Sequence, residues 1–312
     1  MRRPLIRPRA LSPGDRVRVI SPAGPVTPEL LEEGLETLRG WGLSVELDEE
    51  IYARCERADY LAGEDAARLA AVERALEDPD IKAVVFSRGG YGTMRLLEHL
   101  DADALRAHPK LWVGFSDITA LHLFAVQEAG LVTLHGPVVK SFRLHREDAY
   151  DSLEKLRAAL FGERGDEVRI DGLRTVRKGR ARGPLLGGNL SLVAAMVGSP
   201  YCPDLNGAIL LLEEVGEEDY RLDRLFTSLR LSERAAHPAG IVLGDFTKCA
   251  GAHVDAEGID NLIAQLAREF DCPVVADFPT GHGSRNVPVP MGVEATLDAA
   301  RGTLTLATSA VT

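Results

Sequence analysis

Cysteine, tryptophan and aromatic residues in general are scarce in this chain of 312 residues. Aromatic residues make up 5% of it, and only two residues are tryptophan. The four cysteines lie far apart and form no C-x-x-C pair, which argues against a zinc ribbon or a disulfide framework. Isolated cysteines in a chain of this size predict reduced thiols and a cytoplasmic location. No metal ion or other cofactor is predicted.

Positive charge and long apolar runs are also lacking. The chain has 36 lysine and arginine residues against 47 aspartate and glutamate residues, a formal net charge of −11. Nucleic-acid-binding proteins usually carry the opposite sign, so no nucleic-acid partner is predicted. No apolar run reaches the roughly 18 residues of a transmembrane helix, and none of signal-peptide length follows the N-terminus. Neither a membrane partner nor export is therefore predicted.

Strand and helix patterns alternate through the first half of the chain. The apolar run 83–86 is typical of a strand that is buried on both faces, and Pro28 stands at the start of an amphipathic helix. Repeated strand–helix units predict an α/β fold with a doubly wound parallel sheet, in which ligands bind beyond the carboxyl ends of the strands. Loops with glycine or serine fall at three such ends, at 21–25, 87–92 and 114–117.

A charged, glycine-containing stretch at 161–183 interrupts this alternation and predicts a linker with a solvated basic cluster. It separates an N-terminal domain, 1–160, from a smaller C-terminal α/β domain, 184–312. The C-terminal domain is expected to contain strands at 208–213, 240–244 and 274–276, helices at 220–231 and 259–270, and a β-hairpin at 294–307.

Ser116 stands at the most informative position of the chain. The apolar strand 111–114 ends in a glycine, Ser116 follows two residues later, and a helical pattern begins at once. Such a turn lifts a serine out of the sheet, and the first backbone N–H groups of the helix can stabilise an oxyanion. The motif departs from G-x-S-x-G because Ile118 replaces the second glycine. A helix-capping serine would produce the same local pattern, so both interpretations remain open.

A serine nucleophile needs a general base and a carboxylate that orients the base. His282 lies between two glycines just beyond an apolar strand, where packing gives a histidine little reason to be. Glu213 and Glu214 directly follow the apolar run 208–212, and only one of them can face a crevice because side chains alternate along a strand. A glutamate at a strand end can also simply reach water.

The loop 87–92 supplies a further candidate part. Its glycines allow close approach of the backbone, and the N–H of Gly90 can complete an oxyanion hole. A dinucleotide site is the competing interpretation, but the spacing G-G-Y-G and the inner position of the preceding strand match that fingerprint poorly.

Taken together, these segments resemble the L,D-carboxypeptidase family of serine peptidases, also called the muramoyltetrapeptide carboxypeptidase or microcin-immunity family. The matching segments occur in the family's order and cover nearly the whole chain. They are 87–92 with 95–97, 114–121, 135–137, 187–190, 212–214 with 220–224, and 281–282.

The resemblance implies a catalytic triad of Ser116 as nucleophile, His282 as general base and acid, and Glu213 as the orienting carboxylate. The family usually has Glu-Asp where this chain has Glu213 and Glu214. Glu213 falls at the position of the family's triad glutamate. The resemblance places the serine in the N-terminal domain and the other two residues in the C-terminal domain.

The resemblance further implies an oxyanion hole from the backbone N–H groups of Gly90 and Asp117. It implies an N-terminal domain similar to class I glutamine amidotransferase domains, and a cytoplasmic, metal-free homodimer. Arg88 and Arg224 can each offer a fork to the substrate's free carboxylate, and Asn189 is a further candidate for substrate binding.

The implied reaction removes the terminal D-alanine from the tetrapeptide tail of a muropeptide in cell-wall recycling, through an acyl-enzyme on Ser116. The alternative within the family is hydrolysis of a peptidyl- or aminoacyl-nucleotide amide, as in microcin immunity. That pocket would need an aromatic side chain to stack on a base, and the tryptophans at 41 and 112 are expected to be structural. A noncatalytic ligand-binding module is the alternative from another class.

Overall fold

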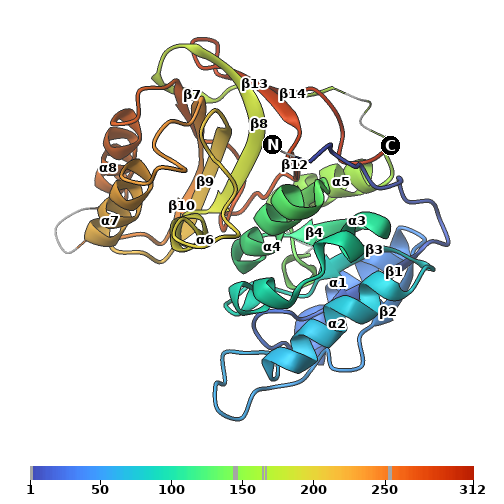
Figure 1. Cartoon of the computed structure of the whole chain (residues 1–312). Coiled ribbons are helices and arrows are strands. Elements are labelled where there is room, and N and C mark those ends of the chain that lie inside the picture. The colour runs from blue at the N-terminus through green and yellow to red at the C-terminus, as the bar shows by residue number, and fades with distance from the viewer. Residues whose placement is uncertain (1–2, 143–146, 164, 166, 252–254) are drawn as a thin grey trace. The chain divides into compact units, whose positions relative to one another are not determined.

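The computed structural model describes residues 3–142, 147–163, 165, 167–251 and 255–312 (Figure 1). The chain forms two compact units. The first comprises Met1–Glu163, Val287–Pro290 and Ala310–Thr312, and the second comprises Arg164–Asn286 and Met291–Ser309. No helix in the described part of the chain is both long and apolar enough to cross a membrane.

The first unit is built on a six-stranded sheet with the order β12-β5-β4-β3-β1-β2. Strands β1 to β5 are parallel wherever they pair, which confirms the predicted doubly wound sheet. The chain reverses its direction of winding at β1, which lies between β2 and β3, and the crevice at such a switch point is where ligands bind in this class of fold. The strands are β1 (Arg16–Ile20), β2 (Ser44–Leu47), β3 (Ile81–Phe86), β4 (Leu111–Gly114), β5 (Thr133–His135) and β12 (Val289–Met291).

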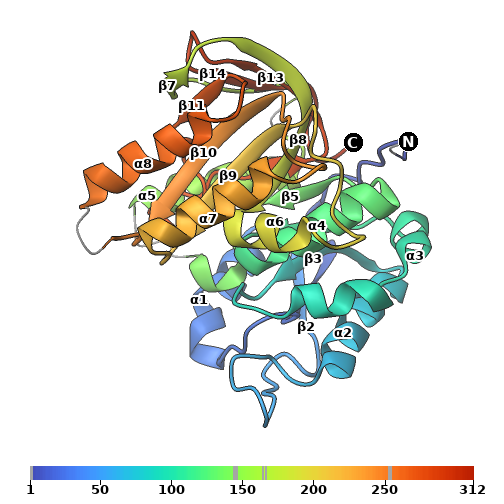
Figure 2. The same cartoon turned by 60° about the vertical axis from the view of Figure 1, so that its left-hand side comes forward.

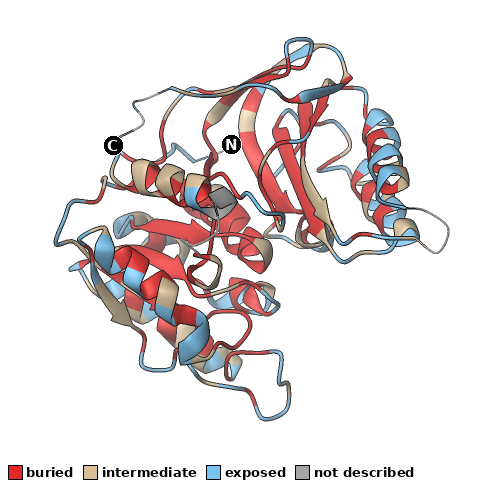
Figure 3. Ribbon diagram, turned by 180° about the vertical axis from the view of Figure 1, so that it is seen from behind, coloured by how far each residue is buried: buried red, intermediate tan, exposed pale blue. Residues whose placement is uncertain are grey.

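Helices cover this sheet and turn their apolar sides inward. Figure 3 shows the inner strands of the sheet buried and the outer sides of the helices exposed. The helix α1 contacts η4, whereas η1 contacts both α2 and α4. The α-helices are α1 (Pro28–Gly40), α2 (Asp65–Glu77), α3 (Ala102–Ala107), α4 (Thr119–Phe124) and α5 (Glu147–Leu160). Shorter helical turns are η1 (Thr93–His99), η2 (Ser116–Ile118), η3 (Ala125–Ala129) and η4 (Val139–Ser141).

The second unit contains an eight-stranded mixed sheet with the order β6-β14-β13-β8-β9-β10-β11-β7. Strands β8 to β11 are parallel, and the predicted hairpin forms β13 and β14. Figure 2 shows α7 and α8 side by side along this sheet. The strands are β6 (Val168–Ile170), β7 (Arg174–Arg177), β8 (Arg180–Asn189), β9 (Ile209–Val215), β10 (Gly240–Thr247), β11 (Val274–Ala276), β13 (Glu294–Asp298) and β14 (Thr303–Leu306). The helices are α6 (Leu190–Met196), α7 (Asp219–Arg230) and α8 (Ala256–Arg268).

The segment 161–183 differs from the expected linker, because β6, β7 and the start of β8 lie within it. Strands β6 and β7 form the two edges of the second sheet, and short edge strands commonly carry charges. The basic cluster is also neutralised, since Arg174 pairs with Asp277 at 2.8 Å and Arg182 with Glu294 at 3.0 Å. High charge here marks sheet edges rather than a connection between domains.

Candidate active site

Ser116 is the first residue of η2, in the sharp turn that follows β4, as the sequence pattern indicates. Its φ is +65°, in the left-handed region, and among the described non-glycine residues only Lys248 and Asp277 share a positive φ. A side chain in this region costs roughly 1–2 kcal/mol, so the surrounding structure must hold the turn. Such strain is typical of a nucleophile that a turn presents above a sheet.

Asp117 anchors this turn from within the first unit. Its buried carboxylate accepts a hydrogen bond from the Thr93 backbone N–H at 2.8 Å, and its carbonyl accepts one from the Thr93 hydroxyl at 2.6 Å. Burial raises the pKa of the Asp117 carboxyl, and the hydrogen bonds from Thr93 oppose this shift. The side chain therefore has a structural role, which leaves the backbone N–H for the implied oxyanion hole.

The loop after β3 packs directly against Ser116. A Cβ atom added to Gly89 would lie 2.6 Å from Ser116 Cβ and 2.7 Å from its Oγ, so no side chain fits there. Gly90 follows with a φ of +122°, which only glycine adopts readily. The Gly24 N–H donates to the Gly89 carbonyl at 3.2 Å, which joins this loop to the one after β1 at the switch point. The structure thus brings together Ser116, Asp117 and the Gly89–Gly90 backbone.

Glu213 and His282 meet in the second unit. The Glu213 carboxylate is fully buried at the end of β9, and its Oε2 lies 2.7 Å from Nδ1 of His282, whose side chain is 19% exposed. Gly281 has a φ of +124°, and a Cβ there would lie 2.9 Å from the same carboxylate oxygen. Burial raises the pKa of Glu213, and the hydrogen bond to His282 opposes this shift. This contact fixes the orientation of the imidazole through its Nδ1 atom.

Glu214 points away from His282 and has a different role. Its carboxylate accepts hydrogen bonds of 2.8 Å from the Asn189 amide and from the backbone N–H groups of Ser191 and Val215. Asn189 also caps α6, because its side-chain oxygen accepts from the Leu192 N–H at 3.2 Å. Alternation along β9 therefore assigns the histidine contact to Glu213 and leaves Glu214 and Asn189 to fix the start of α6.

The two arginines considered for substrate binding lie in different units. The Arg88 guanidinium donates to the carbonyls of Gly89 at 3.2 Å and Pro25 at 3.1 Å, so it braces the two loops at the switch point. Arg224 is exposed on α7, with its guanidinium carbon 5.8 Å from the centre of the Tyr220 ring. The structure thus ties Arg88 to the Ser116 region and places Arg224 on the surface of the second unit.

Asp245 is a residue of this region that sequence reasoning missed. It lies on β10 next to β9, and its backbone N–H donates to the Thr280 carbonyl at 2.9 Å. A Cβ added to Gly283 would lie 2.1 Å from Asp245 Oδ2, so the histidine loop wraps closely around this carboxylate. Burial and the nearby Glu213 raise the pKa of Asp245 to about 6. The sequence feature that could have identified Asp245 is its position just after the apolar part of the strand 240–244.

Asp245→Asn is expected to stabilise the protein at pH 8 and to have a much smaller effect below pH 4. The pKa is raised from 3.8 to about 6, so the folded state holds the proton more tightly and wild-type stability falls as pH rises through this interval. Asparagine avoids that loss and can still accept from the Gly283 N–H. Thermal unfolding at both pH values measures the difference. A variant that melts below wild type at pH 8 would contradict the expectation.

A serine turn beside a glycine loop in one unit, and a buried glutamate–histidine pair in the other, are the parts that an α/β serine hydrolase uses. The chain belongs to the LD-carboxypeptidase family, whose N-terminal domain matches residues 17–136 and whose C-terminal domain matches residues 182–297.

Relatives and solved structures extend this likeness over nearly the whole chain. The protein SCO6489 of Streptomyces coelicolor is 44% identical over 97% of both chains. The murein tetrapeptide carboxypeptidase of Pseudomonas aeruginosa is 36% identical over 92% of this chain and 94% of its own. The structure of the muramoyltetrapeptide carboxypeptidase from Oxalobacter formigenes has a TM-score of 0.80 at 28% identity and covers 93% of this chain and 97% of its own. MccF in complex with glutamyl sulfamoyl guanosine has a TM-score of 0.89 at 22% identity, covers 98% of this chain and 99% of its own, and shares the fold.

Proposed function

We propose that the chain is a serine L,D-carboxypeptidase that removes the terminal D-alanine from the tetrapeptide tail of a muropeptide. The observation that carries the proposal is the Ser116 turn, because its left-handed φ places a half-buried serine beside Gly89, where no side chain fits. The Glu213–His282 pair, with 2.7 Å between carboxylate and imidazole, supplies the matching base. The 36% identical murein tetrapeptide carboxypeptidase supports the substrate class.

In this proposal Ser116, Glu213 and His282 act as a triad. The Ser116 oxygen bonds to the carbonyl carbon of the penultimate residue while His282 Nε2 takes the hydroxyl proton. The negative charge that develops on the carbonyl oxygen is stabilised by the backbone N–H groups of Gly90 and Asp117. His282 then gives its proton to the nitrogen of the departing D-alanine, and the amide bond breaks. Water, deprotonated by His282, releases the peptide from Ser116.

Mass spectrometry of a muramoyl tetrapeptide incubated with the protein tests this function. The expected result is stoichiometric release of D-alanine and accumulation of the tripeptide. A tetrapeptide that ends in L-alanine serves as the control and is expected to stay intact. Release of no amino acid from the D-alanine peptide would contradict the proposal.

Hydrolysis of a peptidyl-nucleotide amide is the second candidate, and one observation favours it. Tyr60 and Tyr91 are exposed beside Gly90, and their ring centres lie 5.9 Å apart, so they can offer a face to a planar base. Sequence reasoning considered only the tryptophans and missed this pair. Competition between the tetrapeptide and an aminoacyl sulfamoyl nucleotide separates the two functions, because the better substrate has the higher kcat/KM.

The family resemblance also supports a cytoplasmic homodimer as part of the proposal. The four cysteines are free and buried, which suits a reducing compartment. Sedimentation equilibrium of a dimer is expected to give twice the chain mass of 33.7 kDa.

A further inference from the structure

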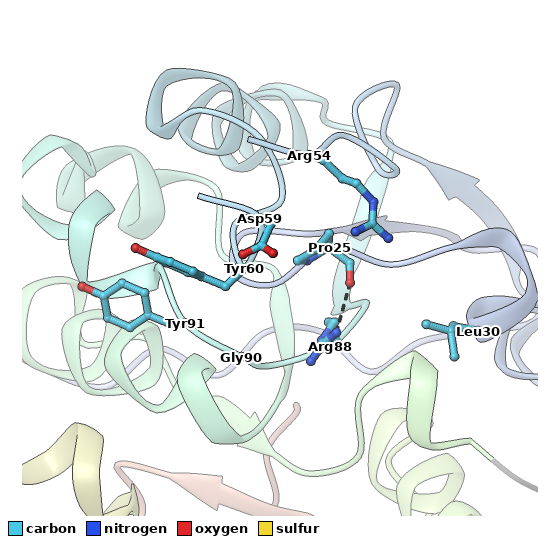
Figure 4. Close-up of a pocket in the computed structure, with 8 residues that line it drawn as sticks. All are labelled: Pro25, Leu30, Arg54, Asp59, Tyr60, Arg88, Gly90 and Tyr91. Atoms are coloured by element: carbon cyan, nitrogen blue, oxygen red, sulfur yellow. Dashed lines mark hydrogen bonds between the residues drawn. The ribbon is translucent and has the colours of Figure 1, made fainter. Parts of the chain in front are cut away.

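The first unit contains a pocket of about 730 Å³ that is lined in part by Gly90, the glycine of the proposed oxyanion hole (Figure 4). The pocket thus adjoins the loop against which Ser116 packs. Tyr60 and Tyr91 lie together at one end of it, and the two guanidinium groups lie near Pro25. Its lining residues are Pro25, Leu30, Arg54, Asp59, Tyr60, Arg88, Gly90 and Tyr91.

Arg54 and Arg88 give this pocket positive charge that no described carboxylate neutralises in an ion pair. Across the chain acidic residues outnumber basic ones by 47 to 36, and arginines in the first unit commonly pair with a carboxylate. Within the described residues, neither Arg54 nor Arg88 forms an ion pair. Arg88 donates to two backbone carbonyls, which leaves its charge intact, and Arg54 makes no hydrogen bond to a described residue. Two such guanidinium groups in one pocket favour an anionic ligand.

Asp59 is the only acid among the residues that line the pocket. It forms no ion pair with Arg54, Arg88 or any other described residue. It therefore reduces the positive potential of the pocket without occupying the N–H donors of either guanidinium group. The pocket consequently keeps a net formal charge of one positive unit, from two arginines and one aspartate. Removing the charge of Asp59 or of Arg54 is expected to change anion binding in opposite directions.

We propose that this pocket is the subsite for a free carboxylate of the peptide substrate, and that Arg54 determines the preference for a substrate with a free C-terminus. The inference rests on the proposed function. The carboxylate of a terminal amino acid lies within one residue of the amide that is cleaved, and Gly90, whose N–H is proposed to bind the oxygen of that amide, lines the pocket. Arg88 is held by Gly89 and Pro25, whereas Arg54 retains its whole fork for a bidentate contact.

Binding to Ser116→Ala protein tests the subsite without turnover. Isothermal titration measures Kd for a tetrapeptide with a free C-terminal carboxylate and for the same peptide as a C-terminal amide. Adding Arg54→Gln is expected to raise Kd for the free acid by about 10- to 100-fold and to leave Kd for the amide unchanged, because a hydrogen bond between two charged groups is lost. Asp59→Asn is expected to lower Kd for the free acid.

Arg57→Gln is the matched control, because Arg57 lies on the same loop, pairs with Glu64 at 3.1 Å and does not line the pocket. It is expected to leave both Kd values unchanged. An equal effect of Arg54→Gln on acid and amide would overturn the inference. The inference would also be overturned if Arg54→Gln still raised Kd for the C-terminal amide but no longer did so once an internal carboxylate of the peptide was amidated. The internal carboxylate, and not the terminal one, would then be the ligand of Arg54. Failure of the proposed function is a different result, because wild-type protein would then release no D-alanine from the tetrapeptide.

Discussion

Replacing Ser116 with alanine is expected to abolish release of D-alanine and to leave the fold intact. The substitution removes the only atom that can form the acyl-enzyme, and loss of a nucleophilic serine in a triad lowers kcat by roughly 10⁶-fold. Alanine tolerates the left-handed φ of +65° no better than serine, so the melting temperature is expected to change little. Steady-state release of D-alanine, together with thermal unfolding, measures both effects.

Ser116→Gly separates chemistry from backbone strain. Glycine lacks the hydroxyl but adopts a positive φ readily, so this variant is expected to be as inactive as Ser116→Ala and to melt above it. Near-wild-type turnover by either variant would show that another residue is the nucleophile. Inactivity with a large fall in melting temperature would instead indicate that the hydroxyl holds the turn.

The parts of the fold that could be predicted depend on local patterns. The strand β3 contains a continuous apolar run, and the turn at Ser116 follows an apolar strand and precedes a helix. Each can therefore be predicted from a few neighbouring residues. The sequence predicts a linker where β6 and β7 form, because short edge strands expose charged side chains to water, and charge alone does not separate an edge strand from a loop.

The contacts within the candidate site could be predicted only as alternatives. Glu213 and Glu214 are equivalent by composition, and the choice between them depends on how β9 is rotated about its axis, which neighbouring strands decide. Glu213 and His282 are 69 residues apart, and Asp245 reaches the same loop from a third segment. The neighbouring sequence does not mark Arg54 as a binding residue. Its proposed role depends on the pocket that it lines and on the lack of an ion pair with any described residue.

Glu213→Gln is expected to lower kcat by about 10³- to 10⁴-fold with a smaller change in KM, because the amide no longer stabilises the imidazolium or fixes its tautomer. Its folding should not suffer. Burial raises the pKa of Glu213 above its ordinary value, so the folded protein loses stability as pH rises through that raised value, and glutamine avoids this loss. Thermal unfolding of the variant is therefore expected to match or exceed wild type above neutral pH.

Glu214→Gln is the matched control, one residue away and equally buried. Glutamine would turn an N–H₂ group toward the donors on Asn189, Ser191 or Val215, so at least one hydrogen bond of 2.8 Å is lost. The expected cost is about 1–3 kcal/mol of stability, with kcat within a few-fold of wild type. A fall in kcat after Glu214→Gln as large as that after Glu213→Gln, with no loss of stability, would contradict the assignment. Opposite effects on rate and stability at adjacent residues follow only if β9 turns one carboxylate to the histidine and the other to α6.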